Sequence, residues 1–154
     1  MKTLHYRQFY QHLNESSEFW GNRGAGCLFV SRSTHRLLLA HRSDRVNEPN
    51  TWGIWGGAIE YGENPKSAAM REAMEESGYD GPMTLLELKK YKNGTFIYHN
   101  YLAVIADEFT PELQWETQDY EWVEYGRWPA PLHFGLEYLI EVEGMRIKKL
   151  IEAI

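Results

Sequence analysis

Cysteine is nearly absent from this sequence, because Cys27 is the only one. A single thiol excludes both an intrachain disulfide and a cluster of thiolate metal ligands. Cys27 lies in the apolar run 25–31, so we expect it to be a small buried side chain. The six histidines are scattered without the spacing of metal ligands, and no Ser-His-Asp or Cys-His set is evident. These absences argue against catalysis through a covalent intermediate, and they leave the acidic side chains as the candidate functional groups.

Long apolar runs and basic runs are also missing. Residues 1–21 are too polar for a signal peptide or a membrane span, so we expect a cytoplasmic protein without membrane contact. The net charge of −6 and the lack of a Lys/Arg run speak against attraction to bulk nucleic acid. Neither a repeat nor a linker divides the chain. We therefore expect one domain over 1–154, monomeric or homodimeric, with 1–21 as an N-terminal extension packed on it.

Acidic side chains are abundant between residues 57 and 79, which read GAIEYGENPKSAAMREAMEESGY. At about 100° per residue, Glu72, Glu75 and Glu76 project from one stripe of a helix. Like charges at this spacing destabilise an isolated helix, so their presence indicates a bound cation. A cluster of hard oxygen ligands suits Mg²⁺ or Mn²⁺, which in turn bind phosphates.

The residues around this stripe predict a helix that holds it in place. Asn64 precedes a proline and reads as an N-cap, the stretch 66–77 is rich in helix formers, and Gly78 stands where a helix usually ends. Arg71 is placed to pair with Glu63 and with the acidic stripe. We expect this pairing to hold the carboxylates in position.

The other elements follow from hydrophobic pattern and turn signals. Asn93-Gly94 is a strong hairpin signal, and 107–119 reads as a polar loop. Gly144 marks a possible kink or boundary in the last helix. The expected strands cover 25–31, 36–41, 83–91, 95–106 and 120–125, and the last helix covers 132–154. Strands on both sides of a central helix, with a helix at the end, predict a mixed sheet between helices.

The segment 57–79 resembles the Nudix box, which reads Gly, five residues, Glu, seven residues, then Arg-Glu-aliphatic-x-Glu-Glu-x-Gly-aliphatic. The matching positions here are Gly57, Glu63, Arg71, Glu72, Ala73, Glu75, Glu76, Gly78 and Tyr79. Tyr79 departs from the usual aliphatic residue, which affects packing rather than chemistry. Upstream, Trp55 replaces the proline of the frequent Trp-x-x-Pro-Gly-Gly pattern, so the preceding loop is expected to differ in shape.

The resemblance to MutT-like Nudix hydrolases implies a fold and a metal site. The implied fold is an α/β/α sandwich with a mixed central sheet, and the implied cofactor is Mg²⁺ or Mn²⁺. Some members carry a further Glu six residues before a Trp-Val pair, and Glu116 stands there relative to Trp122. Glu112 and Asp119 are alternatives on the same loop. The implied metal ligands are Gly57 through its carbonyl, Glu72, Glu75, Glu76 and Glu116.

Roles in catalysis and substrate binding follow as expectations. Glu63 and Gly78 are structural residues of the motif. Trp52 and Tyr98 offer flat faces to a nucleobase, although core packing is the alternative for both. Arg42 lies near the pre-box loop and could meet a phosphate or serve as a surface charge. The expected catalytic residues are Glu72, Glu76, Arg71 and Glu116.

The expected activity is hydrolysis of a diphosphate linkage in a nucleoside diphosphate derivative. The partner is then a small nucleotide, and elimination favours a nucleoside triphosphate. Gly94 occupies the place where ADP-ribose hydrolases often carry Pro, and Tyr98 is not aligned with the marker of dinucleoside polyphosphate hydrolases. Hydrolysis of ADP-ribose, nucleotide sugars or dinucleoside polyphosphates stays open as an alternative. So does a non-catalytic nucleotide-binding regulatory module, although the intact carboxylates favour an enzyme.

Overall fold

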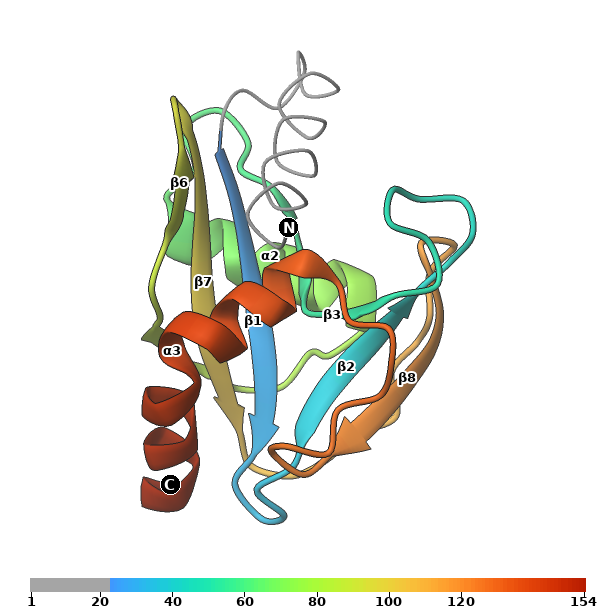
Figure 1. The fold of residues 1–154 in the computed structure, drawn as a ribbon, viewed down its shortest axis with the longest axis vertical. Coiled ribbons are helices and arrows are strands. Elements are labelled where there is room, and N and C mark those ends of the chain that lie inside the picture. The colour runs from blue at the N-terminus through green and yellow to red at the C-terminus, as the bar shows by residue number, and fades with distance from the viewer. Residues whose placement is uncertain (1–22) are drawn as a thin grey trace.

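A mixed sheet forms the centre of the molecule, and two of its central strands run parallel (Figure 1). The computed structural model describes residues 23–154, in which eight strands form this sheet. β1 (Arg23–Ser31) pairs in parallel with β7 (Phe96–Ile105), and the other strand pairs are antiparallel. The other strands are β2 (Leu37–Arg42), β3 (Trp52–Gly53), β4 (Trp55–Ala58), β5 (Thr84–Glu87), β6 (Tyr91–Asn93) and β8 (Thr117–Val123). The extension expected over 1–21 lies outside the described residues.

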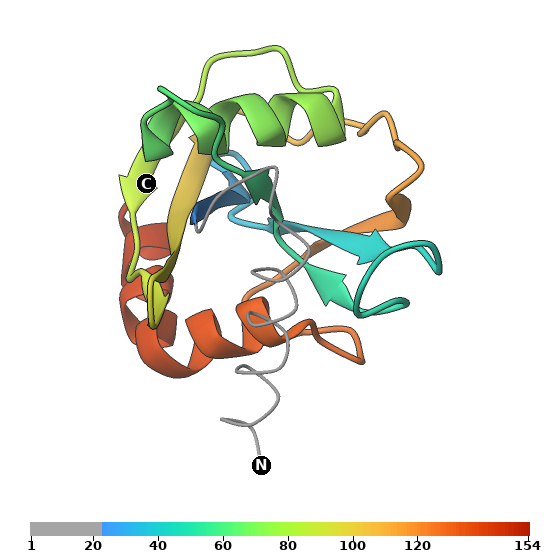
Figure 2. The same ribbon diagram turned by 90° about the horizontal axis from the view of Figure 1, so that it is seen from above.

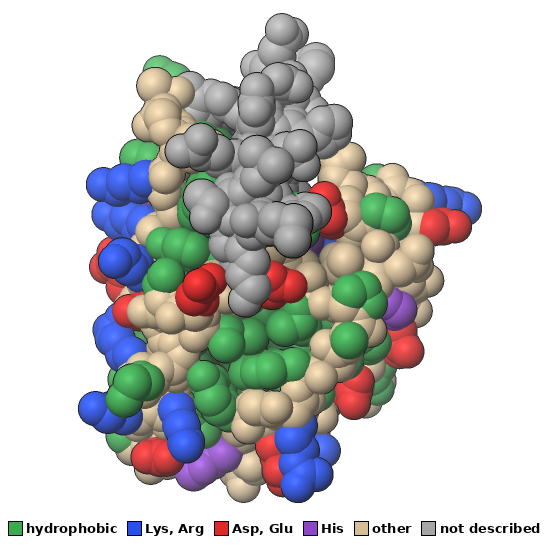
Figure 3. All heavy atoms as spheres, viewed as in Figure 1, with side chains coloured by type: hydrophobic (Ala, Val, Ile, Leu, Met, Phe, Trp, Pro, Cys, Tyr) green, Lys and Arg blue, Asp and Glu red, His purple; other side chains and the backbone are tan. Residues whose placement is uncertain are grey.

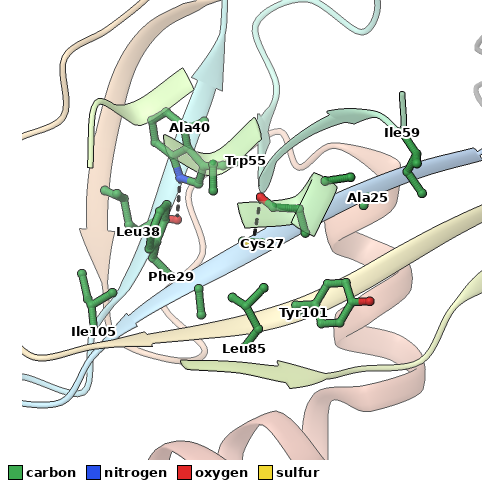
Figure 4. Close-up of a cluster of buried hydrophobic side chains, with 14 residues drawn as sticks. Ala25, Cys27, Phe29, Leu38, Ala40, Trp55, Ile59, Leu85, Tyr101 and Ile105 are labelled. Carbon is green, nitrogen blue, oxygen red and sulfur yellow. Dashed lines mark hydrogen bonds between the residues drawn. The ribbon is translucent and has the colours of Figure 1, made fainter. Parts of the chain in front are cut away.

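Two helices cover opposite faces of the sheet (Figure 2). α2 (Pro65–Ser77) packs on one face and α3 (Phe134–Ala153) on the other, with a separate hydrophobic cluster beneath each. The α2 cluster includes the apolar side chains drawn in Figure 4. This arrangement confirms the expected α/β/α sandwich with a mixed sheet. Within residues 23–154, none of the helices is long and apolar enough to cross a bilayer.

β1 changes its partner along its length, and the change opens a fork in the sheet. Its last residues pair with β2, at Phe29↔Leu38 and Val30↔Leu37. Its first residues instead pair with β4, from Gly24↔Ala58 onward. β2 meanwhile continues beside β3 and β8. The short strand β4 therefore lies in the fork, and it leads directly into the turn before α2.

The helix predicted at 66–77 forms as expected. The Asn64 side chain accepts a hydrogen bond from the Ser67 N–H at 2.8 Å, which satisfies one of the donors at the helix start. Gly78 ends the helix with a φ of 74°, a left-handed conformation that glycine adopts without steric cost. Ala68, Ala69 and Ala73 are fully buried, so the helix approaches the sheet closely.

Several boundaries differ from the prediction. The single strand expected at 83–91 is two strands, β5 and β6. The hairpin turn is Gly94-Thr95 rather than Asn93-Gly94, because Asn93 still pairs with Phe96. Strand β8 begins at Thr117, three residues before the expected start, and the segment before the box forms β3 and β4. These pairings depend on partners distant in sequence, which local patterns do not contain.

Trp55, which stands where the family pattern often has proline, is a core residue. Its side chain is completely buried, and its indole N–H donates to the Leu38 carbonyl at 3.2 Å (Figure 4). Its ring also meets Phe29 edge-on. Cys27 is buried as expected, with its Sγ 3.5 Å from the Ala69 carbonyl oxygen. Burial raises the pKa of the Cys27 thiol to about 12, so it stays protonated and unreactive.

Candidate active site

Arg71 holds the acidic side chains of the box together. Its guanidinium makes two hydrogen bonds to Glu63, from Nε at 2.7 Å and from Nη2 at 2.9 Å. Its Nη1 donates to Glu72 at 2.9 Å and to Glu75 at 3.2 Å. Nη2 also reaches the Ala58 carbonyl at 3.1 Å, which ties the helix to the end of β4. The pairing of Arg71 with Glu63 and the acidic stripe is thus present as the sequence predicted.

The Arg71 hydrogen bonds shift the pKa of the carboxyls unequally. They lower the pKa of Glu63, for which they are the largest influence. For Glu72, burial outweighs the contacts with Arg71, so its pKa is raised. Glu63 is thereby a stable anion that orients Arg71, whereas Glu72 is a carboxylate whose negative charge is incompletely stabilised.

Two glycines let α2 place its carboxylates against the backbone of β4. A Cβ on Gly57 would lie 2.6 Å from the Glu72 carboxyl group, so glycine lets this carboxylate keep the position in which Arg71 holds it. The Gly56 N–H donates to Glu76 at 3.1 Å. The requirement for glycine at the first position of the box therefore has a steric cause in this protein.

Glu116 lies close to the box carboxylates, although forty residues separate it from Glu76 in the chain. Its backbone carbonyl accepts a hydrogen bond from the Ser43 N–H at 2.9 Å, which attaches the loop to the end of β2. Burial raises the pKa of Glu76 well above the usual range, and the charges of Glu116 and Glu72 are the next largest causes. The three carboxylates therefore repel one another at a shared location.

The two alternative acids are engaged elsewhere, and Asp119 lies in β8 rather than on the expected loop, because the strand begins at Thr117. Asp119 accepts a hydrogen bond from the N–H of its neighbour Tyr120 at 2.8 Å and is exposed. Glu112 lies beside Gly78 at the far end of α2, and its N–H donates to the Ser77 carbonyl at 2.8 Å. Glu116, and neither of these two acids, is among the main causes of the raised pKa of Glu72 and of Glu76. Among the loop acids, the geometry thus favours Glu116.

The chemistry of this donor set fits a hard divalent cation. Glu72, Glu76 and Glu116 offer carboxylate oxygens, and their mutual repulsion would be relieved by a positive ion. Within residues 23–154, no set of three His, Cys, Asp or Glu side chains is arranged as a complete metal site. Arg71 instead holds one oxygen each of Glu72 and Glu75. Glu75 is the most peripheral of the expected ligands, with 61% of its side chain exposed.

The Tyr98 side chain lies against Gly24, Gly26 and Gly56, near the carboxylates of Glu72 and Glu76. A Cβ on Gly56 or Gly26 would lie 2.4 or 2.6 Å from its hydroxyl, and one on Gly24 would meet its ring. Burial raises the pKa of Tyr98, and the charges of Glu76 and Glu72 raise it further. The structure thus brings Tyr98 near the carboxylates. Sequence reasoning missed the glycines of β1, although glycine inside a strand often indicates the close approach of another group.

Arg42 lies near the site, but its donors are used by the neighbouring loop. Its Nε donates to the Asn47 carbonyl at 2.9 Å and to the Glu48 carbonyl at 3.3 Å, and its Nη2 also donates to Asn47. Burial lowers the pKa of Arg42, and the charge of Glu76 is the largest opposing influence. Arg42 therefore shapes the loop 43–50 and adds a positive charge beside the acidic cluster.

Trp52 is part of a stack at the end of the fork. Its ring lies parallel to that of His41, with centroids 4.2 Å apart and 5° between the planes. The backbone N–H of Trp52 donates a hydrogen bond to the Pro131 carbonyl, and the backbone carbonyl of Trp52 accepts one from the His133 N–H. These contacts support the packing alternative, and the half-buried Trp52 packs against the hydrophobic cluster beneath α3.

A family comparison matches this geometry. The model of the NUDIX domain matches residues 21–141, which include the sheet, α2 and the loop of Glu116. The chain belongs to the Nudix family. The resemblance of the segment 57–79 to the Nudix box is thereby confirmed, and the Arg71–Glu63 pair and the Gly57–Glu72 contact are features of a folded Nudix domain in this chain.

Curated Nudix relatives match shorter stretches. A proposed 8-oxo-dGTP diphosphatase 3 of Mycobacterium tuberculosis is 38% identical over 64 residues, 39% of this chain and 30% of that protein. Nudix hydrolase 25 of Arabidopsis thaliana is 56% identical over 40 residues, 26% of this chain and 23% of that protein. A CMP-5'-(N-acetyl-N-hydroxy-3-aminopropyl)phosphonate hydrolase of Streptomyces rubellomurinus is 33% identical over 88 residues, 54% and 42% of the two chains. The matches span less than half the length of each relative.

Solved Nudix structures share the fold over most of the chain. The Nudix hydrolase RenU of M. smegmatis has a TM-score of 0.68 at 23% identity, covering 88% of this chain and 89% of that one. A MutT Nudix hydrolase of Burkholderia pseudomallei has a TM-score of 0.61 at 23% identity, covering 78% and 95%. At this identity the likeness shows the Nudix fold alone.

Proposed function

We propose that this protein is a divalent-metal-dependent pyrophosphohydrolase that cleaves a diphosphate linkage in a small nucleotide, with nucleoside triphosphates as the favoured substrates. The observation that carries the proposal is the meeting of Glu72 and Glu76 of α2 with Glu116 of a distant loop beside Gly56. The raised pKa values of Glu72 and Glu76 indicate a repulsion that a bound cation would relieve. Membership of the Nudix family supports hydrolysis of pyrophosphate bonds.

Glu72, Glu76 and Glu116 would hold Mg²⁺ or Mn²⁺, with Glu75 and the Gly57 carbonyl completing the set. When bound, such an ion neutralises phosphate charge and lowers the pKa of an attached water. Arg71 would keep Glu72 and Glu75 in place through the hydrogen bonds it already makes. The Tyr98 hydroxyl would orient a phosphate oxygen, and Arg42, whose Nε and Nη2 hold the loop 43–50, would contribute its positive charge beside Glu76.

The proposed reaction needs one base and no covalent intermediate. Water attacks one phosphorus of the diphosphate linkage, and Glu116 accepts its proton. The P–O bond to the leaving phosphate breaks, and a nucleoside monophosphate and a phosphorylated remainder or pyrophosphate are released. Glu116 suits the role of base because its loop is attached at Ser43 while its carboxylate lies beside that of Glu76.

The names of the relatives support a nucleotide substrate without selecting one. One relative is named for 8-oxo-dGTP and another for a CMP conjugate of a phosphonate. Both contain a nucleoside phosphate, which agrees with the small-nucleotide partner expected from the sequence. Hydrolysis of ADP-ribose, nucleotide sugars or dinucleoside polyphosphates is the alternative activity. A regulatory nucleotide-binding module is disfavoured because all the box carboxylates are present.

A substrate panel tests the proposal directly. The purified protein is incubated with dGTP, 8-oxo-dGTP, ADP-ribose, a nucleotide sugar and a dinucleoside tetraphosphate, each with Mg²⁺, with Mn²⁺ and with EDTA. We expect metal-dependent release of a nucleoside monophosphate from at least one triphosphate. The Glu76→Gln variant, purified in parallel, controls for contaminating hydrolases. Nucleotide binding by calorimetry without turnover of any compound would overturn the proposal in favour of the regulatory module.

A further inference from the structure

Two short basic segments, distant in sequence, carry a large share of the positive charge of this acidic chain. The first contains Lys89, Lys90 and Lys92, around the start of β6. The second contains Arg146, Lys148 and Lys149, in the second half of α3. Neither is a run long enough to stand out in the sequence. Together, the stretches 87–93 and 143–152 hold six cations against three glutamates, whereas the whole chain has a net charge of −6.

The fold places the two segments side by side at one edge of the molecule. Arg146 Nη1 donates to the Glu87 carbonyl at 2.8 Å, and the Tyr138 hydroxyl donates to the Lys90 carbonyl at 3.0 Å. Both contacts join α3 to the chain between β5 and β6. Figure 3 shows Lys and Arg side chains gathered along the corresponding edge, over β6 and the second half of α3. We call the six cations together the basic edge.

The lysines of the basic edge are largely in solvent and unneutralised. Lys89, Lys92, Lys148 and Lys149 are exposed, and no salt bridge involves them among the described residues. Only Arg146 pairs with an acid, Glu143 at 2.9 Å. The positive potential extends beneath the surface. Burial lowers the pKa of His99, and Lys90 is the largest further cause, ahead of Arg23.

We propose that the basic edge binds the phosphate backbone of single-stranded RNA. Phosphates spaced along a flexible chain complement a row of separate lysines, each of which replaces condensed counterions. An acidic protein is a poorer fit, because protein interfaces are depleted in lysine and centred on apolar side chains. Lysines on an edge strand also discourage strand pairing, but that explanation does not extend to Lys148 and Lys149 on α3. The proposal goes beyond the proposed hydrolase activity and does not depend on it.

Fluorescence anisotropy with a labelled, unstructured oligouridylate tests the proposal, in EDTA so that metal at the candidate active site contributes nothing. The test variant is the triple substitution Lys89→Gln, Lys148→Gln and Lys149→Gln. The control is Arg32→Gln, Lys66→Gln and Arg127→Gln, which removes the same charge from exposed positions elsewhere. We expect salt-dependent binding by the wild type and at least about tenfold weaker binding by the test variant. At about 0.7 per phosphate contact, the log–log salt slope should fall by about 2.

The outcomes separate the alternatives. Equal weakening in both triple variants would mean that only net charge matters, and the proposal would be wrong. So would the absence of binding at low salt, or tighter binding of a labelled polyglutamate peptide of equal charge, which would indicate an acidic protein partner. Hydrolysis of the small nucleotide identified above should be unchanged in both variants, so a failure here does not bear on the proposed function.

Discussion

At the scale of single residues, Glu76 combines a buried carboxylate with two acidic neighbours. We predict that Glu76→Gln lowers kcat by on the order of 10²–10³, equivalent to about 2–4 kcal/mol, because a ligand charge is lost. The same variant should melt no lower than wild type in EDTA, since the amide oxygen still accepts from Gly56 and the repulsion from Glu116 and Glu72 is gone. Steady-state kinetics and differential scanning calorimetry measure the two effects. Wild-type turnover by this variant would contradict the site.

Glu116 tests whether the loop before β8 serves the chemistry. We predict that Glu116→Gln lowers kcat at least about tenfold with a smaller change in KM, because a base acts in the transition state. Its melting temperature should change little. Asp119→Asn is the matched control, because Asp119 is an exposed acid three residues further on, in β8, whose side chain accepts a hydrogen bond from the N–H of its neighbour Tyr120. If the control loses turnover and Glu116→Gln keeps it, Asp119 takes the role. If neither matters, Glu72 becomes the leading candidate for the base.

Arg71 joins more acidic groups than any other cation among the described residues. We predict that Arg71→Ala weakens metal binding and lowers the melting temperature, because Glu63, Glu72 and Glu75 are left close together without compensation. Arg71→Lys should rescue only part of the loss, since an ammonium lacks the planar fork that makes two bonds to Glu63. Titration of Mn²⁺ by electron paramagnetic resonance measures the affinity. If the alanine variant bound Mn²⁺ as tightly as wild type, Arg71 would be better interpreted as a solvent-facing residue of the helix without a role at the metal site.

At the scale of elements, the four-residue strand β4 both anchors itself in the core and makes room for neighbouring side chains. Gly57 leaves room for the Glu72 carboxylate, Gly56 leaves room for Tyr98 and the backbone of β1, and Trp55 anchors the strand in the core. We predict that Trp55→Ala lowers the free energy of unfolding by about 3–5 kcal/mol, because a large cavity opens. Trp55→Phe should cost about 1–3 kcal/mol, since the Leu38 carbonyl loses its donor. Urea denaturation measures both.

The control for β4 is Trp115→Ala, at a tryptophan that is 61% exposed. Its effect should stay within about 0.5 kcal/mol. A comparable loss at Trp115 would mean that tryptophan content rather than burial explains the result for Trp55.

At the scale of the whole molecule, the raised pKa of Glu76 and Glu72 links stability to pH. A carboxyl whose pKa is raised by folding binds its proton more tightly in the folded state. Such a carboxyl therefore contributes its full stabilisation of the folded protein below the usual carboxyl pKa of about 4.3. This stabilisation is lost as pH rises through the pKa that the group has in the folded state. Glu63 and Glu108 have lowered pKa values and act in the opposite direction, losing their contribution to stability as pH falls. Burial lowers the pKa of His99 and His133, so these two groups also add stability as pH rises toward the usual imidazole pKa of about 6.5.

We therefore predict that the metal-free wild type loses stability relative to the Glu76→Gln variant as pH rises above the ordinary carboxyl range, and that Mg²⁺ removes this loss by replacing the proton. The melting temperature against pH, in EDTA and in Mg²⁺, measures both curves. Relative to wild type, the EDTA curve of Glu76→Gln should fall less, or rise more, with pH. An unaltered slope in the variant would contradict the burial of an unsatisfied carboxylate at this site.

Much of the site could be predicted because its signals are local. The Asn64 cap, the alanine-rich flank of α2 and the pairing of Arg71 with Glu63 all depend on residues within a few turns of one another. Glu116 required a family pattern, since nothing near it in the chain indicates a metal. Arg42 illustrates the limit of sequence reasoning, because a cation beside a phosphate site and a cation that holds a loop look identical in sequence. The roles of Glu116, Arg42, Trp52 and Tyr98 stay predictions, as do the cytoplasmic location and the oligomeric state.

By itself, the sequence determined the acidic stripe, the helix that carries it, its caps and the family of the chain, because spacing along a helix translates directly into spacing in space. Only the tertiary structure decided that Trp55 fills the core, that Tyr98 lies over the glycines of β1, and that Glu116 stands beside Glu76. It alone joined the cations of β6 to those of α3. Each of these contacts connects residues that the chain separates by more than a dozen positions, and their meeting depends on strand register and helix packing that no local pattern contains.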